Sequence, residues 1–308
     1  DTWLIGKTHM KVDSEGLNRL GIKQDSVIGA RIAECGFDIF VRDDGLWAEG
    51  PEGFYSDLDS PYNQYLKSKG YEGENPWSFH ANAGVTEEGE VASGWFMKNS
   101  RLPANIKEED SETPWLTNQM ISFLELEKCK DHKNQKPWMV HLSYIKPHWP
   151  YIVPSPYNSM YGKEDILPAI RSESETGQGA NPIYKAFSEN VIGRAFRQEK
   201  VREEVIPAYM GLIKQCDDQM GYLFKYMEDE GFMKNTLIVI CSDHGDYLGD
   251  HWLGEKDLFH EPSVKTPLII YDPSSDADTT RGSTNNDLIE AIDLAATFID
   301  YQGATVPD

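Results

Sequence analysis

Residues 236–245, Thr-Leu-Ile-Val-Ile-Cys-Ser-Asp-His-Gly, decide the fold class of this chain. They begin as a short, continuous apolar run, which is typical of a strand buried on both faces. A carboxylate, an imidazole and a glycine follow directly where the strand ends. Similar apolar runs at residues 2–5, 138–145 and 266–271 alternate with segments of helical periodicity. This alternation predicts an α/β fold with a mostly parallel central sheet and helices on both faces.

The helical pattern is strongest between Tyr209 and Met227, where apolar residues recur at spacings of three and four. Gly231 is the expected cap at the C-terminal end of this helix. A second helix is expected to begin at Thr113, which would cap it, with Pro114 in its first turn. A third is expected over residues 287–298.

Two long stretches, residues 41–112 and 151–195, lack a sustained period and are rich in turn-forming and polar residues. Such stretches commonly run over the surface of a sheet and form the rim of a binding site. We therefore expect one α/β domain over residues 1–308, with two irregular excursions that contact the substrate.

The balance of charge limits the partners of the protein. Among 308 residues, 29 Lys and Arg oppose 51 Asp and Glu, giving a formal net charge of −22. This balance argues against nucleic acid as a partner, because a nucleic-acid binder needs a broad basic surface. A small anionic substrate stays compatible, since a few cations in a cleft outweigh a distant acidic surface. Every apolar run is much shorter than the ~20 residues of a membrane span, so none is expected.

The cysteines suggest neither a zinc site nor a disulfide framework. None of the four stands in a C-x-x-C spacing, and the simplest interpretation is four buried or half-buried thiols. They are Cys35, Cys129, Cys216 and Cys241.

Ionisable side chains follow three of the expected strands. Lys7 and His9 come after the first strand, His148 after the run at 138–145, and Asp243 with His244 after the run at 236–241. Ligands of open α/β sheets bind beyond the carboxyl ends of the strands. Convergence of three separate loops at that edge is a stronger indication of a site than any single loop.

Asp243 and His244 together offer a carboxylate oxygen and an imidazole nitrogen, which suit a divalent cation. An isolated Asp-His pair is more often a helix or turn cap beside a hydrogen-bonded histidine. Two ligands are also too few, so a cation bound here would need further oxygen ligands. The nitrogen ligand moves the expectation towards transition metals and away from an all-oxygen calcium cage.

Lys256 and His148 are the other candidates. The segment between Asp243 and Lys256 is rich in glycine and other turn-forming residues, so the chain could fold back and place the lysine at the same site. Most single lysines, however, are simply solvated. His148 lies between Pro147 and Pro150, which stiffen its loop. A rigid histidine suits a general acid or an oxyanion donor, although a surface histidine in a proline-rich turn is common.

Taken together, these segments resemble the sulfatase and phosphonate monoester hydrolase branch of the alkaline phosphatase superfamily. The similarity runs through the whole chain, and the segment from residue 242 to Lys256 is its most specific part. The matching motifs are GKTH at residues 6–9, HLSYIKPHWP at 141–150, SDHG at 242–245, LGDH at 248–251 and Lys256.

The resemblance implies a role for each matching residue. Asp243 and His244 correspond to two ligands of one divalent metal, with calcium or manganese expected first and magnesium or zinc as alternatives. Lys7 corresponds to the lysine that bridges the nucleophile and the sulfuryl or phosphoryl oxygens, and His9 to the histidine that helps break down the covalent intermediate. His148 and Lys256 correspond to the pair that faces the substrate oxygens and the leaving group. The implied substrate is a small anionic ester.

The nucleophile of that family is a formylglycine made from Cys or Ser in a C/S-x-P/A-S/A-R motif, and no cysteine here has that context. By the resemblance, the motif and the first acidic metal ligands belong upstream of GKTH, and relatives continue beyond Asp308 into a smaller subdomain. We therefore expect the chain to be the middle and larger part of a hydrolase, and expect it to be inactive as it stands.

Three hypotheses about function follow. The leading one is a metal-dependent hydrolase of sulfate esters. The second is a phosphonate monoester or phosphodiester hydrolase. The third, from another class, is a catalytically inactive anion-binding or scaffold protein that keeps the fold without the nucleophile.

Overall fold

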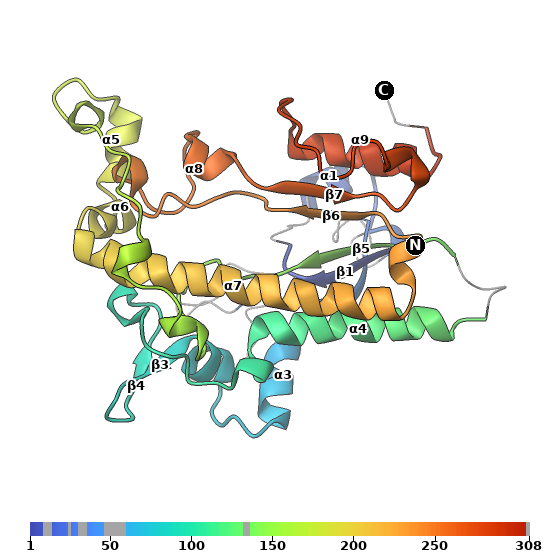
Figure 1. Ribbon diagram of the computed structural model, residues 1–308, viewed down its shortest axis with the longest axis horizontal. Helices are drawn as coiled ribbons and strands as arrows, with labels where there is room; N and C mark the ends of the chain where they lie inside the picture. Colours follow the sequence, from blue (N-terminus) through green and yellow to red (C-terminus); the bar gives the residue numbers. More distant parts are fainter. Residues whose placement is uncertain (9–13, 24–25, 30–35, 46–59, 132–135, 306–308) are drawn as a thin grey trace.

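The computed structural model describes residues 1–8, 14–23, 26–29, 36–45, 60–131 and 136–305 (Figure 1). It has the mixed α/β fold, with a parallel sheet and helices, that the sequence predicts. The strands are β1 (Thr2–Gly6), β2 (Asp38–Arg42), β3 (Ala83–Val85), β4 (Val91–Ser93), β5 (Met139–Ser143), β6 (Ile238–Cys241) and β7 (Leu268–Tyr271). The helices are α1 (Ser14–Arg19), α3 (Pro61–Ser68), α4 (Glu112–Cys129), α5 (Pro182–Ser188), α6 (Val191–Phe196), α7 (Glu199–Asp229), α8 (Glu261–Val264) and α9 (Ala291–Tyr301).

The central sheet places β1 between two parallel neighbours, in the order β2-β1-β5. Leu4 and Ile5 of β1 are fully buried, as a strand between two partners requires. Strand β5 lies within the apolar run predicted at residues 138–145, and β1 extends the run predicted at residues 2–5 by one residue, Gly6. Because all three strands are parallel, their carboxyl ends meet at one edge of the sheet.

Strands β6 and β7 form a separate antiparallel pair. The sequence predicts the run ending at Cys241 to be a strand buried on both faces, but β6 is only half-buried and Cys241 is exposed. The physical reason is that β7 is the one strand paired with β6 in the described part of the chain. Figure 1 shows the pair between the central sheet and α9.

Helices α4 and α7 lie side by side along one face of the central strands, with α1 and α9 on the opposite side (Figure 1). Helix α4 begins at Glu112 and not at the expected Thr113, because Ser111 is the last residue with an extended backbone. Pro114 is therefore in the first turn, where backbone N–H groups have no partner within the helix and proline is tolerated. None of the helices within the described residues is long and apolar enough to cross a membrane.

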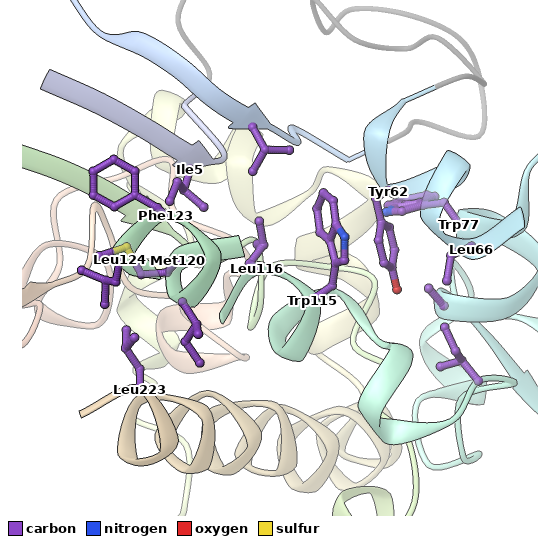
Figure 2. Packing of buried hydrophobic residues seen from close by; sticks show 14 of the residues in the cluster. Ile5, Tyr62, Leu66, Trp77, Trp115, Leu116, Met120, Phe123, Leu124 and Leu223 are labelled. Atoms are coloured by element: carbon purple, nitrogen blue, oxygen red, sulfur yellow. The ribbon is translucent and has the colours of Figure 1, made fainter. Parts of the chain in front are cut away.

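Helix α7 extends the predicted helix at both ends, and the chain turns at Gly231, whose φ of +82° lies in the left-handed region. Leu223 and Met227, near its end, pack into the main hydrophobic core with α4 and β1. Figure 2 shows Leu223 facing the row of α4 residues that runs from Trp115 to Leu124. Nearer its start, Val205 and Leu212 belong to a second core. One helix thus joins both cores.

The described parts of the two excursions contain helices and a hairpin that the sequence does not predict. The first contains α3 and the β3–β4 hairpin, and Asp110 fixes it by accepting hydrogen bonds from Tyr65 (2.8 Å) and Tyr71 (2.9 Å). The second contains α5 and α6 and packs against the start of α7. Neither contact is visible in a local sequence pattern, because each joins residues far apart in the chain.

Candidate active site at the carboxyl edge of the sheet

Lys7 leaves the central strand β1 through Gly6. A Cβ on Gly6 would lie 2.1 Å from the carbonyl oxygen of Ser143 on β5, and its φ is +100°, so only glycine fits. The backbone N–H of Lys7 donates to the same oxygen at 3.3 Å. Burial lowers the pKa of Lys7; the charge of Asp243 opposes this shift and that of Lys256 adds to it.

His148 lies in the loop that follows β5, and its backbone N–H donates to Ile145 O at 3.0 Å. Its Nδ1 lies 2.7 Å from the carbonyl oxygen of Trp149. A carbonyl only accepts, so Nδ1 carries the hydrogen and Nε2 presents a lone pair when the ring is neutral. Burial, together with the positive charges of Lys7 and Lys256, lowers the pKa of His148 to about 3.

Asp243 and His244 follow β6, and their free donor atoms converge. His244 Nδ1 lies 2.8 Å from the carbonyl oxygen of Gly245, which leaves Nε2 as its lone-pair nitrogen. Nε2 is 3.6 Å from Asp243 Oδ2. Two ligands at ~2.1–2.3 Å from one ion, separated by the angles of tetrahedral or octahedral coordination, lie ~3–3.7 Å apart. The pair therefore fits two positions in the coordination sphere of one cation.

The side chain of Asp243 is 79% exposed, so it is open to a cation, to substrate or to another segment of polypeptide. Among the described residues, no group of three or more His, Cys, Asp or Glu side chains is placed to hold a metal ion. A cation held by Asp243 and His244 would thus need further ligands. His9, the remaining residue of the GKTH motif, lies outside the described residues.

Lys256 returns to the same place because the loop between it and Gly245 closes on itself, as the sequence allowed. The N–H of Tyr247 donates to Glu255 O at 2.9 Å, and that of Gly249 donates to Leu253 O at 2.9 Å. Ser263 Oγ then holds the backbone carbonyl of Lys256 at 2.7 Å. The base of this loop carries Asp243 on one side and Lys256 on the other.

The three loops are electrostatically coupled. The charge of Asp243 raises the pKa of Lys7, although burial has the larger, opposite effect. After burial, Lys7 is the next cause of the low pKa of His148, and Lys256 contributes to it as well. The charges of Lys7, Lys256 and Asp243 thus act across loops that are far apart in the sequence, and a single site formed by these residues and His148 stays a prediction.

Two acidic residues at this edge were missed in the sequence. Asp43 and Asp44 follow β2, whose carboxyl end meets those of β1 and β5. Asp44 accepts from the N–H of Thr8 at 2.9 Å and from Arg42 Nε at 2.9 Å, so its charge is already compensated. Asp43 is 1% exposed, and burial and the charge of Glu112 raise its pKa well above the usual range. The signal was an Asp-Asp pair directly after a strand, at the start of an expected excursion.

The buried side chain of Lys146 supports the loop that carries His148. Lys146 Nζ donates to Asn82 Oδ1 at 2.7 Å and to Pro150 O at 2.9 Å, and it lies 4.0 Å from Glu112 Oε2. Burial lowers its pKa to about 8, with Glu112 opposing that shift. Because Lys146 is buried and its ammonium donates to two groups of neighbouring segments, it fixes the loop and is not open to substrate.

A parallel sheet flanked by helices, with polar loops after its strands, is the arrangement of an alkaline phosphatase-like α/β protein. A phosphonate monoester hydrolase of Agrobacterium radiobacter has this fold, with a TM-score of 0.75 and 23% identity over 99% of this chain and 56% of its own. The sulfatase family model matches residues 63–304, and the chain belongs to the sulfatase family.

Curated relatives agree with this assignment. The chain is 29% identical over 217 residues to the multifunctional alkaline phosphatase superfamily protein PehA of Trinickia caryophylli, covering 67% of this chain and 40% of PehA. It is 26% identical over 287 residues to an arylsulfatase of Clostridium perfringens, covering 89% of this chain and 54% of that enzyme. The chain thus spans about half the length of these relatives.

Proposed function

We propose that this chain provides the substrate-binding and part of the metal-binding machinery of a hydrolase of sulfate esters. The convergence of Lys7, His148 and Lys256 on the Asp243–His244 pair supports the proposal most directly. Three positively charged or protonatable groups beside a cation-binding pair suit a small anionic ester. The family match and the similarity to an arylsulfatase favour a sulfate ester as the substrate.

The residues divide the work according to their positions. Lys7 and Lys256 hold the non-bridging oxygens of the ester and offset the charge that develops on them. His148 faces the leaving group; it can donate a proton from Nε2 only after it has gained one, because its free form is neutral with the hydrogen on Nδ1. His9 assists the breakdown of the covalent intermediate by the family resemblance.

Asp243 and His244 would hold one divalent metal through Oδ2 and Nε2, the atoms that converge at 3.6 Å. When bound, that metal lowers the pKa of the nucleophile and polarises the ester. Calcium or manganese is proposed, with magnesium and zinc as alternatives.

The nucleophile is proposed to be a formylglycine contributed by residues encoded before Asp1. The support is that no cysteine of this sequence stands in a C/S-x-P/A-S/A-R context, while the GKTH, HLSYIKPHWP, SDHG and LGDH motifs are present. The upstream segment would also bring the remaining acidic metal ligands to the exposed carboxylate of Asp243.

A phosphonate monoester or phosphodiester is the second candidate substrate. The observation in its favour is the similarity to PehA, a relative described as multifunctional, at 29% identity. Sulfuryl and phosphonyl groups share a tetrahedral arrangement of oxygens, so the same cations could serve both.

Activity assays can separate these proposals. The chain should be produced alone and joined to its naturally encoded upstream residues, then assayed with 4-nitrophenyl sulfate and 4-nitrophenyl phenylphosphonate in the presence of manganese or calcium. We expect hydrolysis only by the extended protein, and faster hydrolysis of the sulfate. Lys256→Ala should reduce the rate on both esters, whereas exposed Lys265→Ala should not. An extended protein that binds sulfate but hydrolyses neither ester would favour the scaffold hypothesis.

A further inference from the structure

The second excursion makes a direct contact with the loop that carries Lys256. Glu175, at the end of a short 3-10 turn (Glu173–Glu175), lies with Oε1 2.7 Å from His251 Nδ1. Burial opposes ionisation of Glu175, but hydrogen bonds from His251 and from the N–H of Ser172 lower its pKa below the usual range. Because a carboxylate only accepts, His251 Nδ1 carries the hydrogen. The contact joins residues 76 positions apart in the sequence.

His251 lies in a loop whose backbone is strained. Each left-handed residue other than glycine costs free energy, so such a loop persists only when surrounding contacts hold it. The four non-glycine residues with positive φ in the described chain all fall here: Leu248 (44°), His251 (53°), Trp252 (62°) and Glu255 (59°). Lys256 is the next residue after the last of them.

The second excursion and its neighbour α7 supply the contacts that hold this loop. Arg171 Nε donates to Gly249 O at 2.7 Å, and Arg202 Nε donates to Leu248 O at 3.2 Å. The N–H of His251 donates to the carbonyl oxygen of Ile170 at 2.6 Å. These three bonds fix the backbone of the loop, whereas Glu175 accepts a hydrogen bond from the imidazole of His251.

The imidazole in turn supports the far side of the loop. Its ring stacks on that of His260, with centroids 4.2 Å apart and an interplanar angle of 18°. His260 Nδ1 lies 3.0 Å from the hydroxyl of Tyr247. The backbone N–H of Tyr247 in turn donates to Glu255 O and so closes the loop. A continuous series of contacts therefore runs from Glu175 to the residue that precedes Lys256.

We propose that Glu175 is a positioning residue which, through His251 and His260, holds Lys256 in place to bind the oxygens of the anionic ester. The inference rests on the proposed function, because it assigns Lys256 to the substrate. It gives the second excursion a role in fixing a cation of the site, in addition to the substrate rim expected from the sequence.

A double-mutant cycle with inorganic sulfate as the probe tests the proposal. Isothermal titration should compare wild type, Glu175→Ala, Lys256→Ala and the double variant. We expect each single variant to weaken sulfate binding by a similar factor, about tenfold, and the double variant to bind no more weakly than Lys256→Ala alone. Glu175→Gln should retain most of the affinity, because its amide oxygen still accepts from His251 Nδ1. Glu173→Ala, in the same turn but exposed, is the matched control.

Hydrogen exchange of the amide of Tyr247, which donates to Glu255 O, gives a readout that does not depend on sulfate. Faster exchange in Glu175→Ala, with the wild-type rate restored in Glu175→Gln, supports the positioning role whether or not wild type binds sulfate. Failure of wild type to bind sulfate would overturn the proposed function. Additive losses of sulfate affinity in the double variant would overturn the positioning role. So would unchanged exchange and unchanged affinity in Glu175→Ala.

Discussion

The hydroxyl of Tyr151 donates a 2.6 Å hydrogen bond to Asp246 Oδ2 and so ties the loop after β5 to the loop after β6. Tyr151 is 1% exposed and lies three residues after His148, while Asp246 lies three residues after Asp243. Burial raises the pKa of Asp246 to about 6, and the bond from Tyr151 opposes this rise. The relative position of the His148 and Asp243 loops therefore depends on a half-buried carboxyl group.

Replacing Tyr151 by Phe should lower the free energy of unfolding by about 1–3 kcal/mol, because a buried oxygen loses its donor. Between about pH 4 and about pH 6 the folded chain binds more protons at Asp246 than the unfolded chain, so this group makes stability fall as pH rises. In Tyr151→Phe the pKa of Asp246 should rise further and extend that fall above pH 6. Urea unfolding at a series of pH values measures both effects.

Asp246→Asn is the control for this pH dependence, since the amide does not titrate. The contribution of Asp246 should be missing from its stability profile between those pH values. An unchanged profile in Asp246→Asn would show that other groups, and not Asp246, produce the dependence.

Binding of an oxyanion should be accompanied by uptake of a proton at His148. The free ring has a pKa of about 3 because of its burial and the nearby lysines, and an added negative charge raises that pKa. Sulfate affinity should therefore increase as pH falls from about 7 to about 5. Titration calorimetry in buffers of different ionisation enthalpy counts the protons taken up, and His148→Asn should remove the uptake. If wild type bound sulfate without taking up a proton, the prediction would be wrong, and His148 would stay neutral in the complex with Nε2 unprotonated.

The isolated chain should bind manganese weakly, with a dissociation constant of about 1 mM, because Asp243 and His244 supply only two ligands and one negative charge. Asp243→Ala should abolish this binding as measured by electron paramagnetic resonance of the free ion. Asp276→Ala, which changes an acidic residue outside the site, should not alter it. Tight binding that survives Asp243→Ala would place the cation elsewhere.

Gly6→Ala should destabilise the protein by more than ~3 kcal/mol, because the added methyl would lie 2.1 Å from Ser143 O in a backbone with φ of +100°. Gly21→Ala is a matched control: its φ is +68°, but nothing lies within 4 Å of the added atom. Only backbone strain, about 1–2 kcal/mol, is expected there. Thermal or urea unfolding of both variants separates the clash from the strain. Equal losses would contradict the close approach of β1 and β5 that places Lys7.

The strands that carry the site could be predicted because each is a short apolar run followed at once by polar side chains. That pattern is local, so the ends of the strands that precede Lys7, His148 and Asp243 could be predicted without knowing the pairing of the strands. Pairing is not local, and nothing in the run at residues 236–241 distinguishes a strand buried in the central sheet from β6, which pairs only with β7 among the described residues.

The supporting residues were beyond prediction for a similar reason. Asp43 and Asp44 stand at the start of a stretch without periodicity, where a carboxylate is normally solvated. Glu175 and His251 lie in two irregular segments, and their contact depends on how both segments fold. Local patterns thus identify candidate ligand-binding residues more readily than the residues that hold them in place.

Helix α7 has 31 residues and is therefore about 46 Å long. It carries Arg202, which holds the Lys256 loop, at one end and Leu223 and Met227, which hold the central sheet, at the other. Unravelling any part of it would expose one of the two cores. We expect the substrate rim and the sheet to melt together in a single cooperative transition, so that a stabilising change at either end of α7 protects the whole domain against heat and proteases.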